Sequence, residues 1–348
     1  MCVRRSAVKL RYGMNPHQSP AMVEPIGTAP FTVVHGHPSY LNLLDAIGAW
    51  QLVREASAGS GTVAAASFKH VSPAGAALAG PIHPVTARLF GVDQSTDAVT
   101  QAYTRARDTD PKSSYGDMVA VSAPVTAELA ELLRRVVSDG IIAPGYEPGA
   151  VAVLSNKKNG TYLILQADSA FAPPVEEVHE LYGLRFVQRR DDAPLPGGLS
   201  ADLRLALTTV RYTQSNSIVL VRDGATLGVG AGQQSRVDCI RLAGTKAQLW
   251  HQRRFIPVDG ASELTSVQDR VNAQLLLAET IDPPVPLQEV SLASDGALPF
   301  EDNITEAVRY GVRNIAEPGG STRSDVVAEA ARRNDINITH TGLRLFRH

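Results

Sequence analysis

The sequence predicts an α/β protein built from two related halves, and two observations carry this prediction. Short apolar runs typical of buried strands alternate with segments of helical periodicity along most of the 348 residues. One arrangement also occurs twice, at residues 141–165 and 314–346. In each copy a strand runs into Ala-Pro-Gly or Ala-Glu-Pro-Gly, a helix follows, and a turn bearing Asn introduces another strand. We therefore expect a duplicated α/β unit with a mostly parallel sheet flanked by helices.

The first half opens with an expected amphipathic helix at 41–56 and a buried strand at 63–68 that delivers Lys69-His70. The following Ser72-Pro73 pair suits either a turn or a helix start, the latter with Ser72 as N-cap and Pro73 at the first helical position. The later elements are expected as a helix at 95–107, a strand at 118–121, a helix at 125–137, a strand at 141–143, a helix ending near 155 and a strand at 162–165.

The second half is expected to follow the Pro/Gly-rich linker at 190–199, which gives domains at 1–190 and 200–348. A helix at 201–209 leads into a polar string, residues 212–217, and then a strand at 218–221. Asp223-Gly224 predicts a hairpin. The glycine-rich stretch 228–236 either cradles an anion at a helix start or forms a tight structural turn. A helix at 324–333 and a strand at 338–340 end the chain.

Composition narrows the class of protein. A hydrophobic content of 44% with 20% charged residues indicates a soluble globular protein. The net charge of −2 provides no field for nucleic acid or an anionic membrane, so local arginines have to bind any anionic ligand. Two cysteines, Cys2 and Cys239, imply no disulfide framework. No apolar run approaches the roughly 20 residues of a membrane span, and the cytoplasm is the expected location.

The pair Lys69-His70 is the first candidate site. A buried strand ends there by presenting an ammonium and an imidazole side by side. Sites in open α/β sheets lie at such strand ends. An isolated Lys-His pair is more often a surface lysine beside a structural histidine, so its meaning depends on the other motifs of the chain.

Five segments together resemble one family, AICAR transformylase. They read Leu-Arg-Tyr-Gly-Met-Asn-Pro-His-Gln at 10–18, Ser-Phe-Lys-His-Val-Ser-Pro-Ala-Gly at 67–75, Tyr-Thr-Gln-Ser-Asn-Ser at 212–217, Gly-Ala-Gly-Gln-Gln-Ser-Arg at 230–236 and Leu-Arg-Leu-Phe-Arg-His at 343–348. The resemblance runs in order from about residue 9 to the last residue. It implies two duplicated cytidine-deaminase-like α/β/α subdomains with a small extra segment, and a homodimer whose active sites straddle the interface. A zinc deaminase is excluded because the chain has no Cys-x-x-Cys pair.

The resemblance implies transfer of the formyl group of 10-formyltetrahydrofolate, a co-substrate, to the 5-amino group of AICAR ribotide. That amine is weakly basic and must lose a proton as it attacks, a task suited to histidine near neutral pH. By resemblance His70 is the base, Lys69 stabilises the developing oxyanion, and Asn216 hydrogen-bonds the reacting groups. The implied nucleotide contacts are Arg11, Tyr12, Gly116, Asp139, Ala297 and Arg344; the implied folate contacts are Arg236, Asp302, Ser321 and Thr322. A K⁺ site is implied at Val210, Thr213, Ser215, Ser217 and Asp295.

Two of these residues also have a purely structural interpretation. Asp139 precedes a glycine and suits the start of a turn, and Asp302 suits the N-cap of a helix over 303–310. From the residues alone, without the family resemblance, the structural interpretation is favoured for both.

The chain departs from the family pattern in several ways. The cyclohydrolase domain of the bifunctional relatives is not expected on this polypeptide, and the 250–290 segment and the 190–200 linker are shorter. Ala297 stands where relatives carry an aromatic residue, and Arg347, near the implied cation site, stands where they carry a histidine. An alternative hypothesis is therefore formylation of an AICAR-like aminocarboxamide nucleotide in specialised metabolism. A second alternative, a catalytically silent AICAR- or folate-binding regulator, is disfavoured because Lys69, His70 and Asn216 are all present.

Overall fold

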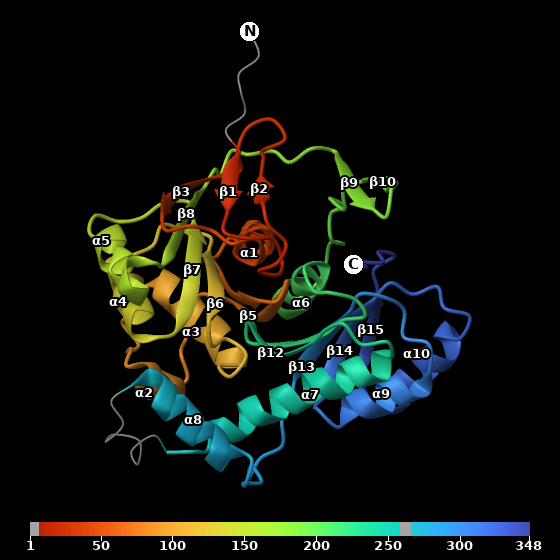
Figure 1. The fold of residues 1–348 in the computed structure, drawn as a ribbon. Coiled ribbons are helices and arrows are strands. Elements are labelled where there is room, and N and C mark those ends of the chain that lie inside the picture. Colours follow the sequence, from red (N-terminus) through yellow and green to blue (C-terminus); the bar gives the residue numbers. More distant parts are fainter. Residues whose placement is uncertain (1–6, 258–265) are drawn as a thin grey trace.

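A central mixed sheet organises the computed structural model, which describes residues 7–257 and 266–348 (Figure 1). The α/β class is therefore confirmed, but the expectation of a mostly parallel sheet is wrong. Six of the pairings in this sheet are antiparallel and four are parallel, because each half begins with an antiparallel hairpin. In spatial order the strands of this sheet are β15 (Asn337–His340), β14 (Val312–Glu317), β13 (Val290–Ser294), β11 (Ile218–Arg222), β12 (Ala225–Gly230), β5 (Ser72–Leu78), β4 (Ala64–Lys69), β6 (Asp117–Val121), β7 (Ser138–Ala143), β8 (Leu163–Ala167) and β3 (Phe31–His35).

Helices cover both faces of the sheet (Figure 1). One face carries α1 (Tyr40–Ser60) and α6 (Ala201–Arg211), which enclose one apolar core with it. The other face carries two further cores under α2 (Pro84–Phe90), α3 (Ala98–Thr109), α4 (Ala127–Arg135), α5 (Ala150–Ser155), α7 (Arg236–Arg253), α8 (Val267–Ala278), α9 (Glu301–Val308) and α10 (Ser324–Arg333). Two small hairpins lie outside the sheet: β1 (Val8–Leu10) with β2 (Ala21–Val23), and β9 (Glu176–Leu181) with β10 (Leu184–Arg189).

The duplication predicted from the repeated segments is visible in the topology. The order β5-β4-β6-β7-β8 in one half matches β12-β11-β13-β14-β15 in the other, with the same strand directions. A helix precedes each hairpin, α1 in one half and α6 in the other. The halves join through antiparallel β5 and β12, so one sheet continues through both. The proposed domain division at 190–200 stays a prediction.

The helix expected from Ser72-Pro73 is wrong, because the chain turns back along β4 and continues as β5. Small residues serve a different purpose here. A Cβ added at Gly75 would lie 2.1 Å from the Ala106 carbonyl oxygen, so β5 and α3 pack at backbone distance. Pairing of Ser72 and Pro73 with β4 therefore overrides the local preference of this pair for a helix start.

Three further details differ from the local expectations. Asp302 is not an N-cap: α9 begins at Glu301 and its cap position is Phe300, which leaves Asp302 in the first turn. Asp139 lies within β7 rather than at the start of a turn, because β7 begins at Ser138. In the glycine-rich stretch, a Cβ at Gly228 would lie 2.0 Å from the Ala243 carbonyl oxygen, so this glycine lets β12 pack against α7.

Some expectations fall partly outside the described residues. The 250–290 segment contains α8, while residues 258–265 lie outside the description, as does Cys2. Cys239 is a free, buried cysteine. Within residues 7–257 and 266–348, no helix is long and apolar enough to cross a membrane. Over the same ranges, no group of three His, Cys, Asp or Glu side chains is placed to hold a metal ion.

Candidate active site

The Lys69-His70 pair lies at the turn of the β4–β5 hairpin. Lys69 pairs with Ser72 across the hairpin, so the loop consists of His70 and Val71 alone. Both loop residues have positive φ, 56° for His70 and 63° for Val71, as a type I′ turn requires. The result is that β4 ends by presenting the exposed imidazole of His70 at the tip of the hairpin.

The Lys69 ammonium reaches toward the neighbouring strands. It donates a hydrogen bond to the carbonyl of Tyr115, and a Cβ built on Gly116 would lie 4.0 Å from Lys69 Nζ and 3.8 Å from Asp139 Oδ1. Lys69, Gly116 and Asp139 therefore meet, as the family resemblance implies. They meet at the amino ends of β6 and β7, because β6 runs antiparallel to β4 and β7 follows β6.

A buried ionic network fixes the loop that accepts this ammonium. The Arg107 guanidinium pairs with Asp117 at 2.8 Å, and the Ser67 hydroxyl donates to the same carboxylate at 2.7 Å. The Ser114 hydroxyl, one residue before Tyr115, lies 2.7 Å from the Ser67 hydroxyl and donates to it, because the single Ser67 proton goes to Asp117. Burial raises the pKa of Asp117, while the charge of Arg107 opposes that rise. This network ties β4 to the 110–116 loop and holds the Lys69 acceptor in place.

Two lysines that sequence reasoning missed lie beside Asp139. Lys158 Nζ pairs with Asp139 Oδ1 at 2.6 Å. Its neighbour Lys157 donates to the carbonyl of Val136, and burial together with the charge of Arg107 lowers the pKa of Lys157 to about 8. The signal in the sequence was Lys-Lys-Asn-Gly just before a strand, a turn that positions two cations. Local positive charge therefore surrounds the predicted nucleotide contact.

The polar string 212–217 reaches the same edge of the sheet from the second half. The amide of Gln214 donates to Ser72 Oγ at 3.3 Å, directly beside the His70 turn. Asn216 lies just before β11, and its backbone N–H donates to the carbonyl of Gln233, which follows β12, at 3.2 Å. Antiparallel pairing of β5 with β12 brings these ends together, because the start of β5 lies opposite the end of β12.

Asp295 organises the second-half residues of the predicted site. Its carboxylate accepts from the Arg236 guanidinium and, at 2.5 Å, from the Ser215 hydroxyl. Its carbonyl accepts from the amide of Leu345 at 2.9 Å, which draws the C-terminal segment to this point. A predicted folate contact, a predicted cation ligand and the C-terminal motif thus form one cluster.

Phe346 is another residue that the sequence reasoning did not single out. The guanidinium carbons of Arg344 and Arg236 lie 4.8 and 5.4 Å from the centroid of its ring. Since Arg236 is already paired with Asp295, the exposed Arg344 guanidinium is the cation of this pair that remains suited to an anionic ligand. Its position within Leu-Arg-Leu-Phe-Arg-His, between two arginines, was the available signal.

The structure leaves other predicted residues apart. Arg11 stacks on Tyr12 with 5.9 Å between guanidinium and ring, in the loop after β1, and no hydrogen bond or ion pair joins this pair to other predicted site residues in the described part of the chain. Asp302 lies at the start of α9, and Ser321 and Thr322 precede α10. These two segments are neighbours, since Arg323 lies 5.2 Å from the Phe300 ring. Ala297 is half-buried in the loop after β13.

The residues predicted to hold K⁺ come from the segment 210–217 and from Asp295, which are joined by a backbone hydrogen bond. Thr213 donates its amide to the Val210 carbonyl at 2.9 Å, and Asp295 donates its amide to the Ser217 carbonyl at 3.3 Å. Ser217 Oγ is buried and has no hydrogen-bond partner among the described residues. The orphaned Ser217 hydroxyl is the one observation that fits a large, weakly held monovalent cation. The other oxygens are already engaged, because the Val210 and Ser217 carbonyls accept backbone hydrogen bonds and the Asp295 carboxylate accepts from Arg236 and Ser215.

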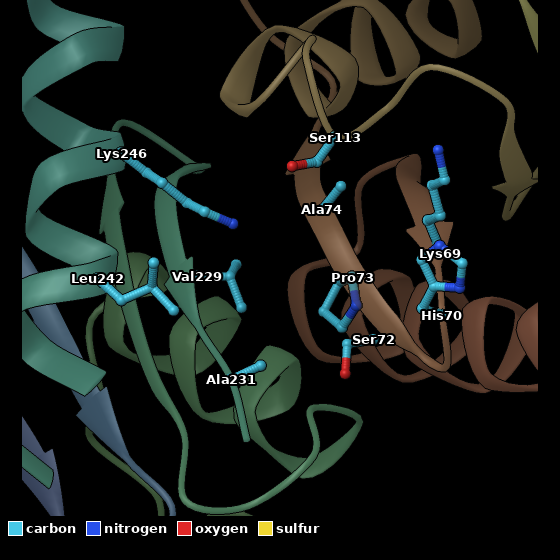
Figure 2. Close-up of a pocket in the computed structure, with 10 residues that line it drawn as sticks. All are labelled: Lys69, His70, Ser72, Pro73, Ala74, Ser113, Val229, Ala231, Leu242 and Lys246. Atoms are coloured by element: carbon cyan, nitrogen blue, oxygen red, sulfur yellow. The ribbon is translucent and has the colours of Figure 1, made fainter. Parts of the chain in front are cut away.

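A cavity of about 390 Å³ lies beside the hairpin, between β5, β12 and α7 (Figure 2). Figure 2 shows Leu242 and Lys246 projecting from α7 toward it, with Ser113 on the opposite wall. Lys246 pairs with Asp110 at 3.0 Å. Of the predicted site residues only Lys69 and His70 line this cavity; the others approach the hairpin turn from elsewhere on the sheet edge or lie apart.

Comparison with known proteins agrees with the motifs. A family model described as the AICARFT/IMPCHase bienzyme matches residues 2–246. The chain is 33% identical over 361 aligned residues to the bifunctional purine biosynthesis protein PurH of Roseobacter denitrificans. That alignment covers 98% of this chain and 60% of the relative, so the chain spans about three fifths of the length of the curated relative it matches. With the Lys69-His70 hairpin, the polar 212–217 string and the Arg236–Asp295 cluster in place, the chain belongs to the AICARFT/IMPCHase bienzyme family.

Proposed function

We propose that this protein transfers the formyl group of 10-formyltetrahydrofolate to the 5-amino group of AICAR ribotide, giving FAICAR and tetrahydrofolate. The observation that carries the proposal is the β4–β5 hairpin turn, which presents His70 beside Lys69 while the Lys69 ammonium meets Gly116 and Asp139. Family membership supports the reaction class. A net charge of −2 and local clusters of arginine favour small anionic substrates over nucleic acid.

In this reaction the amine nitrogen forms a bond to the formyl carbon, and the carbonyl oxygen gains negative charge. His70 accepts the proton that the amine loses, and the Lys69 ammonium stabilises the oxyanion. Collapse of the tetrahedral intermediate breaks the bond between the formyl carbon and N10 of the folate, which takes up a proton. The Asn216 amide orients the reacting groups from the second half of the chain.

The arginine side chains assigned to the site are opposite in charge to the phosphate and carboxylate groups of the two substrates. We assign Arg11, Tyr12, Gly116, Asp139, Ala297 and Arg344 to the nucleotide, and Arg236, Asp302, Ser321 and Thr322 to the folate. The exposed Arg344 on the Phe346 ring supports anion binding at the edge of the sheet, and Arg236 lies beside it in its ion pair with Asp295. Bidentate guanidinium groups suit phosphate and carboxylate oxygens.

A K⁺ ion bound near Ser217 belongs to the proposal. Val210, Thr213, Ser215, Ser217 and Asp295 would supply its oxygens, and the orphaned Ser217 hydroxyl supports this choice. When bound, the ion would order the 212–217 string by charge neutralisation. The string presents Asn216, so the ion would act on binding geometry rather than on the reacting atoms.

We further propose a homodimer acting in the cytoplasm. Arg11 and Tyr12, and likewise Asp302, Ser321 and Thr322, stand apart from the Lys69-His70 turn within one chain. A second copy that brings such residues to the turn would complete each site. Gel filtration with light scattering tests the dimer.

The decisive experiment is a steady-state assay with AICAR and 10-formyltetrahydrofolate. Formation of FAICAR in step with tetrahydrofolate supports the proposal, and the absence of both products with saturable binding of AICAR indicates the silent regulator instead. The small side chain of Ala297, where the family resemblance implies an aromatic residue, motivates one alternative acceptor, an AICAR-like aminocarboxamide nucleotide. A kcat/KM for such an analogue at least tenfold above that for AICAR would establish it.

A further inference from the structure

The turn that presents His70 is built from residues that do not favour it. Type I′ turns place both central residues at positive φ and select Asn-Gly or Asp-Gly. Here the two residues are His70 and Val71, at φ 56° and 63°. A β-branched residue such as valine rarely adopts this conformation, so it persists only where the surroundings impose it.

A buried carboxylate from α1 meets this turn. Asp45 Oδ1 accepts a hydrogen bond from the amide of Val71 at 2.6 Å, and its side chain is 8% exposed. Burial raises the pKa of Asp45, while hydrogen bonds from the amides of Val71 and His70 and the charge of His70 oppose that rise. In the sequence Asp45 is the single charged residue of the run Leu-Asn-Leu-Leu-Asp-Ala-Ile.

Close packing of α1 on β4 puts Asp45 within reach. A Cβ added at Gly48 would lie 2.9 Å from a ring carbon of Phe68, so this glycine admits the ring between helix and strand. Asp45 lies one turn earlier on the same face of α1. Since Phe68 is the penultimate residue of β4, the carboxylate arrives just beyond the strand end, at the turn.

The other half of the molecule contains the same device. Asp202 in α6 accepts from the amides of Asp223 at 3.0 Å and Gly224 at 2.7 Å, the two central residues of the β11–β12 turn. Asp223 and Gly224 also have positive φ. The helix, hairpin and carboxylate correspond in the two halves, so the Asp45 contact is a feature of the repeated unit and not a chance contact.

We propose that Asp45 is a positioning residue: it holds His70 and Val71 in the type I′ turn and thereby sets the direction of the His70 imidazole. The proposal rests on the proposed function for its kinetic consequence. Asp45 acts through backbone amides and does not touch the reacting groups. Its loss therefore changes the rate of the reaction more than the affinity for the nucleotide.

The test compares Asp45→Ala, Asp45→Asn and the double variant Asp45→Ala/Val71→Gly. Asp45→Ala should lower kcat by roughly 10- to 100-fold, the scale of a small misplacement of a reacting group, with nucleotide KM changed less than about threefold. Asp45→Asn retains an acceptor oxygen and should keep most of the activity. Glycine adopts φ of 63° without strain, so Val71→Gly should recover at least about a third of the loss.

Asp202→Ala is the matched control, since it removes the equivalent contact at a turn that lacks a catalytic histidine. It should leave kcat within about twofold. Rescue absent from the double variant, or equal losses in Asp45→Ala and Asp202→Ala, would show that Asp45 matters only for overall stability. Either result overturns the proposal.

Hydrogen exchange at the Val71 amide separates this proposal from the proposed function. Faster exchange of the Val71 amide in Asp45→Ala than in the parent protein, with unchanged exchange within β4, supports the positioning role of Asp45 even if AICAR proves not to be the acceptor. Unchanged exchange at Val71 refutes that role even if the formyl transfer is established.

Discussion

The turns of the two hairpins, His70-Val71 in one half and Asp223-Gly224 in the other, share their geometry and differ in chemistry. Each is a two-residue loop with positive φ, and each meets an aspartate from the helix before its hairpin. The Asp-Gly turn suits this conformation, and its Asp223 carbonyl accepts from Arg105 in a purely structural contact. The His-Val turn does not suit it and carries the proposed base. The two halves thus contain hairpin turns of the same geometry. Only the His70-Val71 turn, which carries the proposed catalytic base, places a β-branched residue in a strained backbone conformation.

The two turns also face opposite edges of the sheet. Because β5 and β12 pair antiparallel, the end of β4 and the start of β11, which Asn216 precedes, lie at the same edge of the sheet with β5 and β12 between them. The β11–β12 turn lies beside Leu78 at the opposite edge. The second half therefore contributes to the candidate site from the carboxyl ends of β13 and β14 rather than from its own hairpin turn. One edge of the continuous sheet gathers residues from both halves.

The largest contrast is expected from His70→Ala against Asp223→Ala, which occupy equivalent turn positions. His70→Ala should lower kcat by about 10²- to 10⁴-fold through loss of the general base. Nucleotide binding, measured by calorimetry, should change little. Asp223→Ala should stay within about twofold of the parent kcat. Near-parent turnover in His70→Ala would assign the base elsewhere.

The next contrast concerns the residues before the turns, Lys69 and Arg222. Lys69→Ala should lower kcat by about 10²- to 10³-fold because the oxyanion loses its cation, and Lys69→Arg should recover only part of that loss. Arg222 donates to the Gln288 carbonyl at 3.2 Å and stacks on Trp250, so Arg222→Ala should affect stability alone. Full activity in Lys69→Arg would show that the reaction needs only a positive charge at this position and not the ammonium group of lysine.

A smaller effect, on stability, is expected from exchanging the turn residues. Gly224→Val forces a β-branched residue to φ of 69° and should lower the free energy of unfolding by about 1–3 kcal/mol. Sterics add little, since the nearest side-chain atom to a Cβ there is 3.7 Å away. Val71→Gly should raise the free energy of unfolding by roughly 1 kcal/mol, strain relief outweighing the entropy of glycine. Urea denaturation measures both, and a loss of stability in Val71→Gly would deny that the turn is strained.

The smallest expected effect is the pH dependence of stability that Asp45 introduces. Its pKa in the folded protein is raised above the usual 3.8, so the unfolded chain loses this proton first as pH rises. The parent protein should therefore lose stability relative to Asp45→Asn as pH increases from 3.8 through the raised value, and the gap should then stay constant. Denaturation series between pH 4 and 8 test this. A gap that closes with rising pH would mean that the charges of His70 and the turn amides outweigh burial.

The α/β class and most of its elements could be predicted from the sequence, because apolar periodicity and turn residues act locally. The expected helix at 324–333 has the bounds of α10, and Asp223-Gly224 makes the predicted hairpin. The Ser72-Pro73 helix start failed because pairing with β4 and packing on α3 overrode a local preference. The sequence likewise placed Lys69, His70 and Asn216 on strand ends. It could not show that Asp45 contacts the turn, that Lys158 pairs with Asp139, or that Arg236 lies over the Phe346 ring, because each contact joins segments that only the fold brings together.

By itself the sequence determined the repeat, the family and the identity of the candidate catalytic side chains, since these depend on residue types in order along the chain. Only the tertiary structure decided which of these side chains share an edge of the sheet. Strand direction placed Gly116 and Asp139 beside Lys69, and the β5–β12 pairing brought Gln214 to Ser72. Long-range backbone pairing of this kind leaves no mark on either segment alone. The Asp45 contact, 26 residues from Val71 along the chain, arises in the same way from the packing of α1 on β4.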